Sequence, residues 1–428
     1  MNVDQNHRKG ALVSELKDNA RTYLIAILLG LSVGLVVSGF IWGVVSLKNF
    51  VWHHAGWNYH GYTVLIICTL GGLIVGVFNQ LARAKETQAH DLDEVLGEVE
   101  LIEEVPLPKV SQVFRRIALG ITSLGFGGPL GPEAPIIEIS TQLSARLSGV
   151  LKIAKSKAVN ISVAGSLGAL FGAPIAIASN ELEVPQTNIP DQQSNSRTQR
   201  LRNLGPEIVA AVAAFLIFKK LLPGDGFAPF TSEANSSDSI FGIGILLVIV
   251  AAILATAVAL LVQRALVMIR HLVVTYVPGG ALVAGLVSGA VLGVGGMTNH
   301  LVLFSGHHEI QELLDNPHKR SFLIAVMLLK IVVLIACLAG GWFGGQIFPM
   351  SFIGVCIALV CDSLFGYSNT LAFAGVGFVS AVTVALRKPI LSIVLGFLFF
   401  PASTWLALLI GTGVALAVVR QQSESVRH

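Results

Sequence analysis

The stretch "GPLGPEAPII", Gly128 to Ile137, places one carboxylate among glycines and prolines, and apolar sequence continues on both sides. Proline suits the first turn of a helix, where its missing N–H has no partner anyway, and glycine just before it lets the chain turn tightly. The stretch therefore predicts a helix that starts near Glu133, inside an apolar region.

The composition is that of a membrane protein. Hydrophobic residues make up 54% of the chain, charged residues make up 12%, and the mean hydropathy is +0.75, whereas soluble domains carry about 25% charged residues. Tyr23–Leu47 and Ser239–Val262 contain no charge, and each exceeds the roughly 20 residues that span a bilayer. Further apolar stretches lie at residues 61–81, 117–139, 158–179, 208–218, 279–297, 322–341, 350–360, 370–386 and 389–418. We expect an all-α polytopic membrane protein with about ten embedded segments, some of them broken.

The basic residues are concentrated in a few places. They gather at residues 8–21, 109–116, 146–157 and 197–202, with Arg420 and Arg427 near the end. Because positive loops stay in the cytoplasm, this pattern predicts that both termini are cytoplasmic, and we expect the protein in the plasma (inner) membrane. The four cysteines all lie in apolar stretches and are typical of small core residues, with neither a disulfide nor a metal spacing.

A second stretch repeats the pattern of the first. In "WFGGQIFPMS", Trp342 to Ser351, Gly345 and Pro349 have the same Gly-x-x-x-Pro spacing as Gly131 and Pro135. Both stretches follow the glycine-rich end of an apolar run, and both open a new run.

The next proline in each half also corresponds. Pro174 lies 39 residues after Pro135 (174 minus 135), and Pro389 lies 40 residues after Pro349 (389 minus 349). Glycine and proline are common in membrane helices, so one match would carry little weight, but two at nearly equal spacing favour an inverted repeat with its site near the midplane. The predicted parts are a cytoplasmic N-terminal segment (1–21), a first half (22–204) with a cytoplasmic loop at 183–204, a second half (205–419), and a short cytoplasmic tail (420–428) without a regulatory domain.

Helix N-termini inside the membrane favour an anion. Their free N–H groups and positive dipole ends bind negative charge, and fixed dipoles hold a permeating anion less tightly than a full positive charge would. At such a place Glu133 can occupy the anion site itself when ionised and leave it when protonated. The alternative is a carboxylate that only caps the helix; the mirrored site carries no carboxylate, which favours the gate.

Four motifs together resemble the CLC family of chloride channels and chloride/proton antiporters. They are "GPLGPEAPII", "FGAPIAIA", "GGWFGGQIFPMSFIG" and "RKPILSIV", and the correspondence runs from about Tyr23 to Val418. The resemblance implies an all-helical homodimer in which each subunit is an inverted repeat with its own pore. It implies that Glu133 is the external gate, and that the anion is contacted by residues of the two elements, including the backbone N–H groups of Ile347 and Phe348. The residues carried over from these elements are Gly131, Ala134, Gly345, Gln346, Ile347 and Phe348.

The sequence departs from the family pattern at several site positions. Pro132 replaces a basic residue, and Ile347 stands at the usual phenylalanine. Where the family has a Gly-Ser-Gly-x-Pro loop, this chain reads "AKETQAHDLDE", so Thr87 is the candidate for the hydroxyl, with Gln88 and His90 as alternatives. The family's central tyrosine is missing, and the residues nearest its position are Ser403 and Thr404.

The predicted function is transport of an inorganic anion, most directly chloride. The family's antiporters carry a glutamate at the second position of a Glu-Glu pair; here a count from Pro174 gives Glu183 at the first position and Val184 at the second. Valine cannot accept a proton, so passive conduction is favoured over exchange, with Glu183 as a candidate inner proton acceptor or else a solvated loop residue. A fluoride/proton antiporter of the same family and an inverted-repeat transporter for another solute remain alternatives.

No enzymatic activity or cofactor is predicted. An intramembrane enzyme needs a second catalytic group beside Glu133, and none is evident. His307 and His308 are adjacent, and adjacent residues on a helix point apart, which disfavours a metal site.

Overall fold

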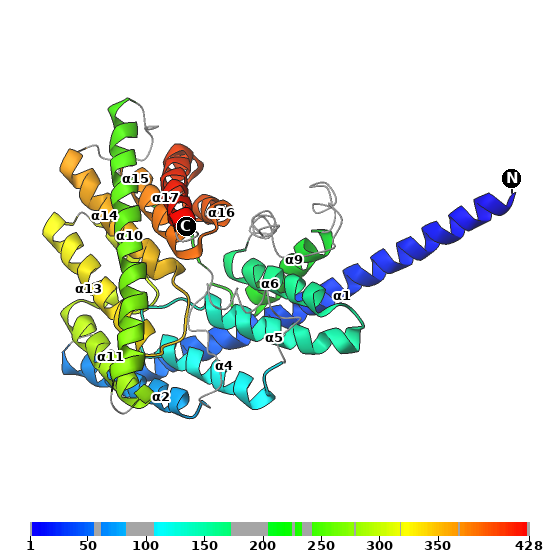
Figure 1. Ribbon diagram of the computed structural model, residues 1–428, viewed down its shortest axis with the longest axis horizontal. Helices are drawn as coiled ribbons and strands as arrows, with labels where there is room; N and C mark the ends of the chain where they lie inside the picture. Colours follow the sequence, from blue (N-terminus) through cyan, green and yellow to red (C-terminus); the bar gives the residue numbers. More distant parts are fainter. Residues whose placement is uncertain are drawn as a thin grey trace. The chain divides into compact units, whose positions relative to one another are not determined.

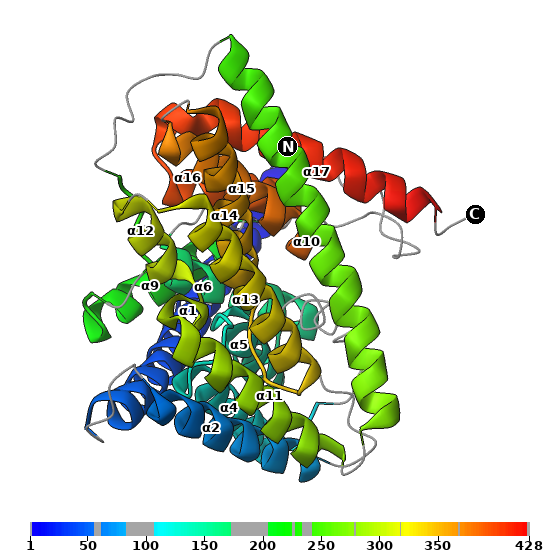
Figure 2. The ribbon, with the colours of Figure 1, turned by 90° about the vertical axis from the view of Figure 1, so that its left-hand side faces the viewer.

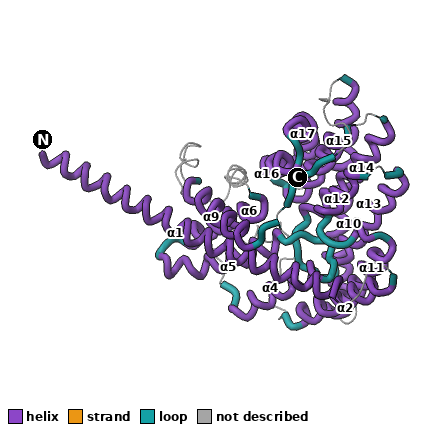
Figure 3. The backbone as a smooth tube through the Cα atoms, turned by 180° about the vertical axis from the view of Figure 1, so that it is seen from behind, coloured by secondary structure: helices purple, strands orange, loops and turns teal. Residues whose placement is uncertain are grey.

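The structure, a computed structural model, describes residues 2–54, 61–82, 107–172, 204–224, 227–232, 242–277, 280–316, 318–366 and 369–425. Over these ranges the chain forms helices joined by loops (Figure 3), and the extended pairing consists of one isolated bridge between Gly131 and Gly345. The predicted all-α architecture is confirmed.

The described residues form fourteen α-helices. Their bounds are α1 Asn2–Asn49, α2 Tyr62–Gln80, α4 Val110–Gly125, α5 Glu133–Leu151, α6 Lys155–Phe171, α9 Gly205–Leu221, α10 Ile243–Tyr276, α11 Gly280–Thr298, α12 His307–Asp315, α13 Arg320–Ala339, α14 Ile347–Phe365, α15 Thr370–Leu386, α16 Pro389–Phe399 and α17 Trp405–Ser425. A π-helical turn covers Phe50–His54, and two 3₁₀ turns cover His300–Val302 (η2) and Ala402–Thr404 (η3).

Seven helices among the described residues are long and apolar enough to cross a membrane: Asn19–Trp52, Tyr62–Gln80, Ile243–Val273, Gly280–Thr298, Arg320–Ala339, Ile347–Leu364 and Ala402–Gln421. The sequence suggests one apolar stretch at 389–418, but the structure forms two helices there, α16 and α17, and the helix breaks between them at Phe400 and Pro401. Phe400 and Pro401 both adopt extended backbone angles. Proline disfavours the helical conformation for the residue before it and cannot donate the helix hydrogen bond.

The chain forms two compact units, which group packed elements and differ from the two predicted repeat halves. The boundaries of those halves stay a prediction. The first unit comprises residues 1–39, 101–108 and 136–226, and the second comprises 40–100, 109–135 and 227–428.

Small residues set the packing of the first unit. Its helices are the first part of α1, most of α5, α6 and α9. Gly30 of α1 lies against the backbone of Ala210 in α9, and Gly168 of α6 lies against Ala211. Close approach of helix backbones at small residues is a principal way to gain packing energy in a membrane, where lipid is as apolar as the side chains.

The second unit uses the same device between two spans. α2 and α11 lie side by side (Figures 1 and 2), and a Cβ added at Gly72 would meet the carbonyl of Gly285 and the backbone of Gly289. Gly354 of α14 and Gly377 of α15 are in equally close contact. The long helix α10 runs along α13, α14, α15 and α17 (Figure 2), so these spans form one packed group.

Two pairs of helices repeat each other in length and position. α5 and α14 each have 19 residues, and both start two residues after a motif glycine, 214 positions apart (347 minus 133). α6 and α15, which follow them, each have 17 residues. The predicted helix starts at both Gly-x-x-x-Pro stretches are therefore confirmed.

Candidate functional site

The two glycine-rich loops pair with each other. The N–H of Gly131 donates to the carbonyl of Gly345 (2.9 Å), and the N–H of Gly345 donates to the carbonyl of Gly131 (2.7 Å). Because each glycine lies two residues before the start of its helix, this pairing brings the first turns of α5 and α14 to one place.

The turns that lead into the loops repeat each other bond by bond. At the end of α4, Gly128 N–H donates to the carbonyl of Ser123 (3.0 Å); 214 residues later, Trp342 N–H donates to the carbonyl of Cys337 (3.0 Å). The Ser123 hydroxyl also accepts a hydrogen bond from the N–H of Phe343 (3.0 Å), which ties the end of α4 to the second loop.

The Glu133 carboxyl group lies at the meeting point of the loops. Its side chain is completely buried, and neither carboxyl oxygen has a hydrogen-bond partner among the described residues. A Cβ added to Gly131 or to Gly345 would collide with Oε2 of Glu133. The carboxyl group is thus packed against the Cα atoms of both glycines, and only glycine leaves room for it at either position.

The electrostatics of this place come from helix ends. The first N–H groups of a helix have no partner within the helix, and its N-terminus carries a partial positive charge. Glu133 is itself the first residue of α5, and its carboxyl group touches the glycine that precedes α14 by two residues. A negative charge here, whether a carboxylate or a bound anion, is therefore favoured by the dipoles of two helix ends.

The residues predicted to contact the anion differ in whether their backbone N–H groups are already hydrogen-bonded. The N–H groups of Gly131 and Gly345 are engaged with each other's carbonyls, so these two residues shape the site through their missing side chains. Ala134, Ile347 and Phe348 are buried in the first turns of α5 and α14. Their N–H groups stay the predicted anion contacts.

Gln346 has a partner that the sequence did not indicate. Its side-chain oxygen accepts a hydrogen bond from Nε2 of Gln263 in α10 (2.9 Å), and the Gln346 side chain is buried. Gln263 is an amide inside the largely apolar span Ile243–Val273, next to Arg264. A polar side chain in such a span could have signalled a partner, but not which one.

The two candidates for the missing tyrosine differ in exposure. Ser403 is exposed, whereas Thr404 is buried and its hydroxyl donates to the carbonyl of Pro401 (2.8 Å). Both residues stay predictions for the position of the missing tyrosine. Thr87, Gln88, His90, Glu183 and Val184 lie outside the described residues.

His307 lies in an aromatic box beside Phe348. The imidazole packs edge-on to Phe348 (5.1 Å between ring centroids) and also against the rings of Phe227, Phe230 and Phe399. Its Nε2 is 3.0 Å from the carbonyl of Ala228, and burial, aided by neighbouring His308, lowers the pKa of His307 to about 4. In the described part of the chain no cluster of three or more histidine, cysteine, aspartate or glutamate residues is placed to hold a metal ion.

Comparison with known proteins agrees with this architecture. Residues 71–420 match the model of the family described as voltage gated chloride channel. The chain is 26% identical over 416 residues to the "Putative ion-transport protein YfeO" of Escherichia coli O17:K52:H18 (strain UMN026 / ExPEC), covering 92% of each chain, and equally similar to that of Shigella flexneri.

Solved structures show the same fold. A slow cyanobacterial Cl-/H+ antiporter superposes with a TM-score of 0.78 at 20% identity, covering 94% of this chain and 95% of that one. A CLC-type fluoride/proton antiporter gives a TM-score of 0.74 at 18% identity, covering 93% and 94%. With its apolar spans, the protein is an integral multi-pass membrane protein. The chain belongs to the CLC family of voltage-gated chloride channels and transporters.

Proposed function

We propose that the protein moves a small inorganic anion, chloride in the first place, and that the Glu133 carboxyl group is the gate. The observation that carries this proposal is the position of that group, buried against Gly131 and Gly345 at the start of α5 and of α14, which is a candidate membrane span. It lies where an anion held by helix N-termini would lie.

The gate works by competition. Ionised, the carboxylate holds the site between the helix ends and excludes a free anion of the same charge. Protonated, it loses its attraction to the positive dipole ends, leaves the site, and an anion enters. Transport then rises with acidity. Because dipoles rather than a cationic side chain hold the anion, it can also leave.

Passive conduction is the mode we propose. The residue at the family's inner-glutamate position is Val184, which cannot accept a proton. Proton-coupled exchange of chloride or fluoride is the alternative, since the similar structures include a Cl-/H+ and a fluoride/proton antiporter. In that case Glu183 would be the inner acceptor.

The test of the gate is anion efflux from liposomes at acidic and at neutral pH. Glu133→Ala should give flux equal to or above that of the wild type and remove its pH dependence. Glu138→Gln is the matched control, because Glu138 is also a buried carboxylate on α5 but already accepts a hydrogen bond from Gln142 (2.9 Å). A Glu133→Ala protein with the wild-type pH response would contradict the gate.

The test of the mode is an imposed chloride gradient across the same liposomes. Passive conduction predicts no uphill proton movement. Robust proton pumping that is lost in Glu183→Gln would instead establish exchange, with Glu183 as the inner acceptor.

A further inference from the structure

A lysine lies buried inside one of the membrane spans. Lys330 is in the middle of α13 and is completely buried. Ionisable residues inside membrane segments are costly, so they are functional candidates whose partners need to be identified. The gate proposed above does not use this one.

The Lys330 ammonium group is bound by backbone carbonyls. Its Nζ lies 3.4, 3.2, 3.2 and 2.9 Å from the carbonyl oxygens of four successive residues, Leu301, Val302, Leu303 and Phe304. An ammonium group has three N–H donors, so the four oxygens share them. The positive charge therefore fixes the path of one short backbone segment, residues 301–304.

That segment is bent at Phe304. Phe304 has a φ of 54°, in the left-handed region that a residue with a side chain rarely adopts. Such a conformation costs free energy and persists only where its surroundings impose it. The Lys330 ammonium does so from one side, through the shortest of its four contacts. From the other side, the Phe304 ring packs against Trp52 (5.6 Å between centroids) and lies under Nζ of Lys48 (4.0 Å).

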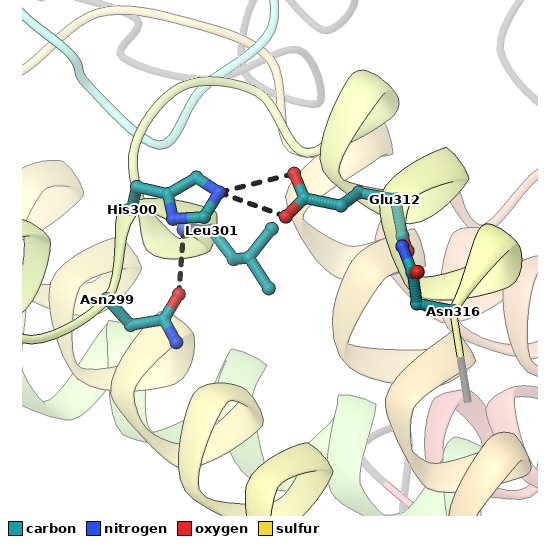
Figure 4. A network of polar contacts seen from close by, with 5 residues as sticks. All are labelled: Asn299, His300, Leu301, Glu312 and Asn316. Atoms are coloured by element: carbon teal, nitrogen blue, oxygen red, sulfur yellow. Dashed lines mark hydrogen bonds and ion pairs between the residues drawn. The ribbon is translucent and has the colours of Figure 1, made fainter. Parts of the chain in front are cut away.

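The residues just before this segment make a second, more exposed set of contacts. His300 in η2 contacts both carboxylate oxygens of Glu312 in α12 (3.1 and 3.2 Å), and Leu301 N–H donates to the side chain of Asn299 (2.9 Å), as Figure 4 shows. The His300–Glu312 pair is about half exposed, so it contributes little on its own. The buried contacts of Lys330 therefore constrain this segment more strongly than the exposed pair does.

Phe304 connects this region to the gate loop. Its N–H donates to the carbonyl of Gly127 (3.0 Å), and Gly127, with a φ of 91°, is the turn from which the loop to Gly131 and Glu133 departs. Trp52 supports the same turn, because its ring N–H donates to the carbonyl of Gly125 (3.0 Å). A continuous set of contacts thus runs from Lys330 through Phe304 to the loop that carries Glu133.

A buried cation occupies the equivalent position of the first half. Arg116 in α4 and Lys330 in α13 each lie 15 residues before the glycine of their loop (131 minus 116, 345 minus 330). Arg116 is also buried, and its guanidinium lies 4.4 Å from the ring centroid of Phe343, two residues before Gly345. Arg116, in the first half, thus contacts the loop of the second half. Lys330, in the second half, binds the segment whose Phe304 supports the loop of the first half.

From this geometry we infer that Lys330 is a positioning residue for the gate. This inference rests on the proposed function of Glu133. By binding the carbonyls of residues 301–304, its ammonium group holds Phe304 against Gly127 and keeps the Glu133 carboxyl group in its closed position. The other titratable groups around it are Glu309 on α12, Cys337 on α13 and Cys356 on α14, with Lys48 on the far side of the Phe304 ring.

The test compares Lys330→Met and Lys330→Arg in the liposome efflux assay, each in the wild-type and in the Glu133→Gln background. Lys330→Met keeps an unbranched side chain one atom shorter than lysine and removes the charge and the N–H donors. It should raise flux at neutral pH and reduce the acid-to-neutral ratio of flux by about fivefold or more, the lower end of typical coupling between sites. Lys330→Arg should restore most of that ratio. In the Glu133→Gln background, where no gate remains to be positioned, Lys330→Met should leave flux within about twofold.

Two outcomes overturn the inference: a Lys330→Met protein with the wild-type ratio, or a loss of flux of equal size in both backgrounds. Amide hydrogen exchange separates this inference from the gate itself. Lys330→Met should speed exchange in residues 301–304 and 127–131 whatever Glu133 does, and unchanged exchange there contradicts the positioning role. If the Lys330→Met protein does not fold, Lys330→Gln, which keeps two N–H donors but loses the positive charge, should show the same faster exchange; its absence overturns the inference.

Discussion

At the scale of single residues, the candidate site depends on two glycines, whose lack of a side chain leaves room for the Glu133 carboxyl group. Gly131 and Gly345 have no Cβ, and the Glu133 carboxyl group fills the space that those atoms would occupy. Neither glycine has a positive φ, so a side chain is excluded here by the contact with Glu133 and not by the backbone conformation. The two residues can therefore be used to displace the gate without straining the chain.

Gly345→Ala should act as an opening mutation. The added methyl group would overlap Oε2 of Glu133, and overpacking of this kind typically costs about 1–3 kcal/mol, which is relieved if the carboxyl group moves out. Efflux at neutral pH should therefore rise, and its pH dependence should weaken. In the Glu133→Ala background the carboxyl group is gone and the Cβ of residue 133, at 3.3 Å, is the part of that side chain left near the added methyl group, so Gly345→Ala should have little further effect. A further large loss of flux there would show that the methyl group obstructs the anion instead.

At the scale of elements, much of the helical pattern could be predicted from the sequence. The starts of α5 and α14 were predicted from Gly-x-x-x-Pro, because proline and glycine have strong local preferences. The break between α16 and α17 does not follow from the apolar pattern, because the run at residues 389–418 is interrupted by Pro401 but stays apolar on both sides of it. Apart from the meeting of the two Gly-x-x-x-Pro loops, contacts between particular residues of distant segments could not be predicted. Gln263 with Gln346 and Phe304 with Gly127 depend on tertiary packing, for which hydrophobic periodicity carries no signal.

The contact between α2 and α11 predicts a stability difference between two glycines. Gly72→Ala places a methyl group on the backbone of Gly285 and Gly289 and should lower the free energy of unfolding by about 2 kcal/mol. Gly39→Ala in α1, where an added Cβ meets nothing within 4 Å, is the matched control and should be neutral or slightly stabilising. Thermal unfolding in detergent measures both. Equal melting temperatures for the two variants would show that the α2–α11 contact is not tight.

At the scale of the whole molecule, the fold is that of the CLC family. Selectivity among anions then depends on the groups that contact the anion along its path. The family's usual tyrosine is absent, and of the two hydroxyl residues near its position the buried one, Thr404, donates to the backbone carbonyl of Pro401. Backbone dipoles, which select charge more than identity, would then dominate. Anion preference and subunit assembly are the two properties that follow at this scale.

Competition between anions checks the first property. We expect chloride, bromide and nitrate to be transported at rates within about one order of magnitude of one another, because helix dipoles discriminate weakly between anions of the same charge. A strong preference for fluoride over all three would favour the fluoride-transporting members of the family instead.

Crosslinking in liposomes checks the second property. We propose a two-fold homodimer, the commonest closed symmetry, and candidates for its interface include the apolar helical residues 208–218 and 408–418, which expose part of their side chains. A dimer should be captured at protein densities at which anion flux is measured. Full flux from subunits that crosslink only as monomers would show that the dimer is not required.

The central claim is that the Glu133 carboxyl group is the gate, and anion efflux as a function of pH in Glu133→Gln tests it most directly. Glutamine keeps the size and the hydrogen-bonding atoms of the side chain but cannot ionise. It therefore imitates the protonated gate at every pH. The account predicts that Glu133→Gln conducts at neutral pH at least as fast as the wild type does at acidic pH, with no remaining pH dependence. Flux in Glu133→Gln that still rises with acidity as it does in the wild type would contradict the account, since the titrating group would then lie elsewhere.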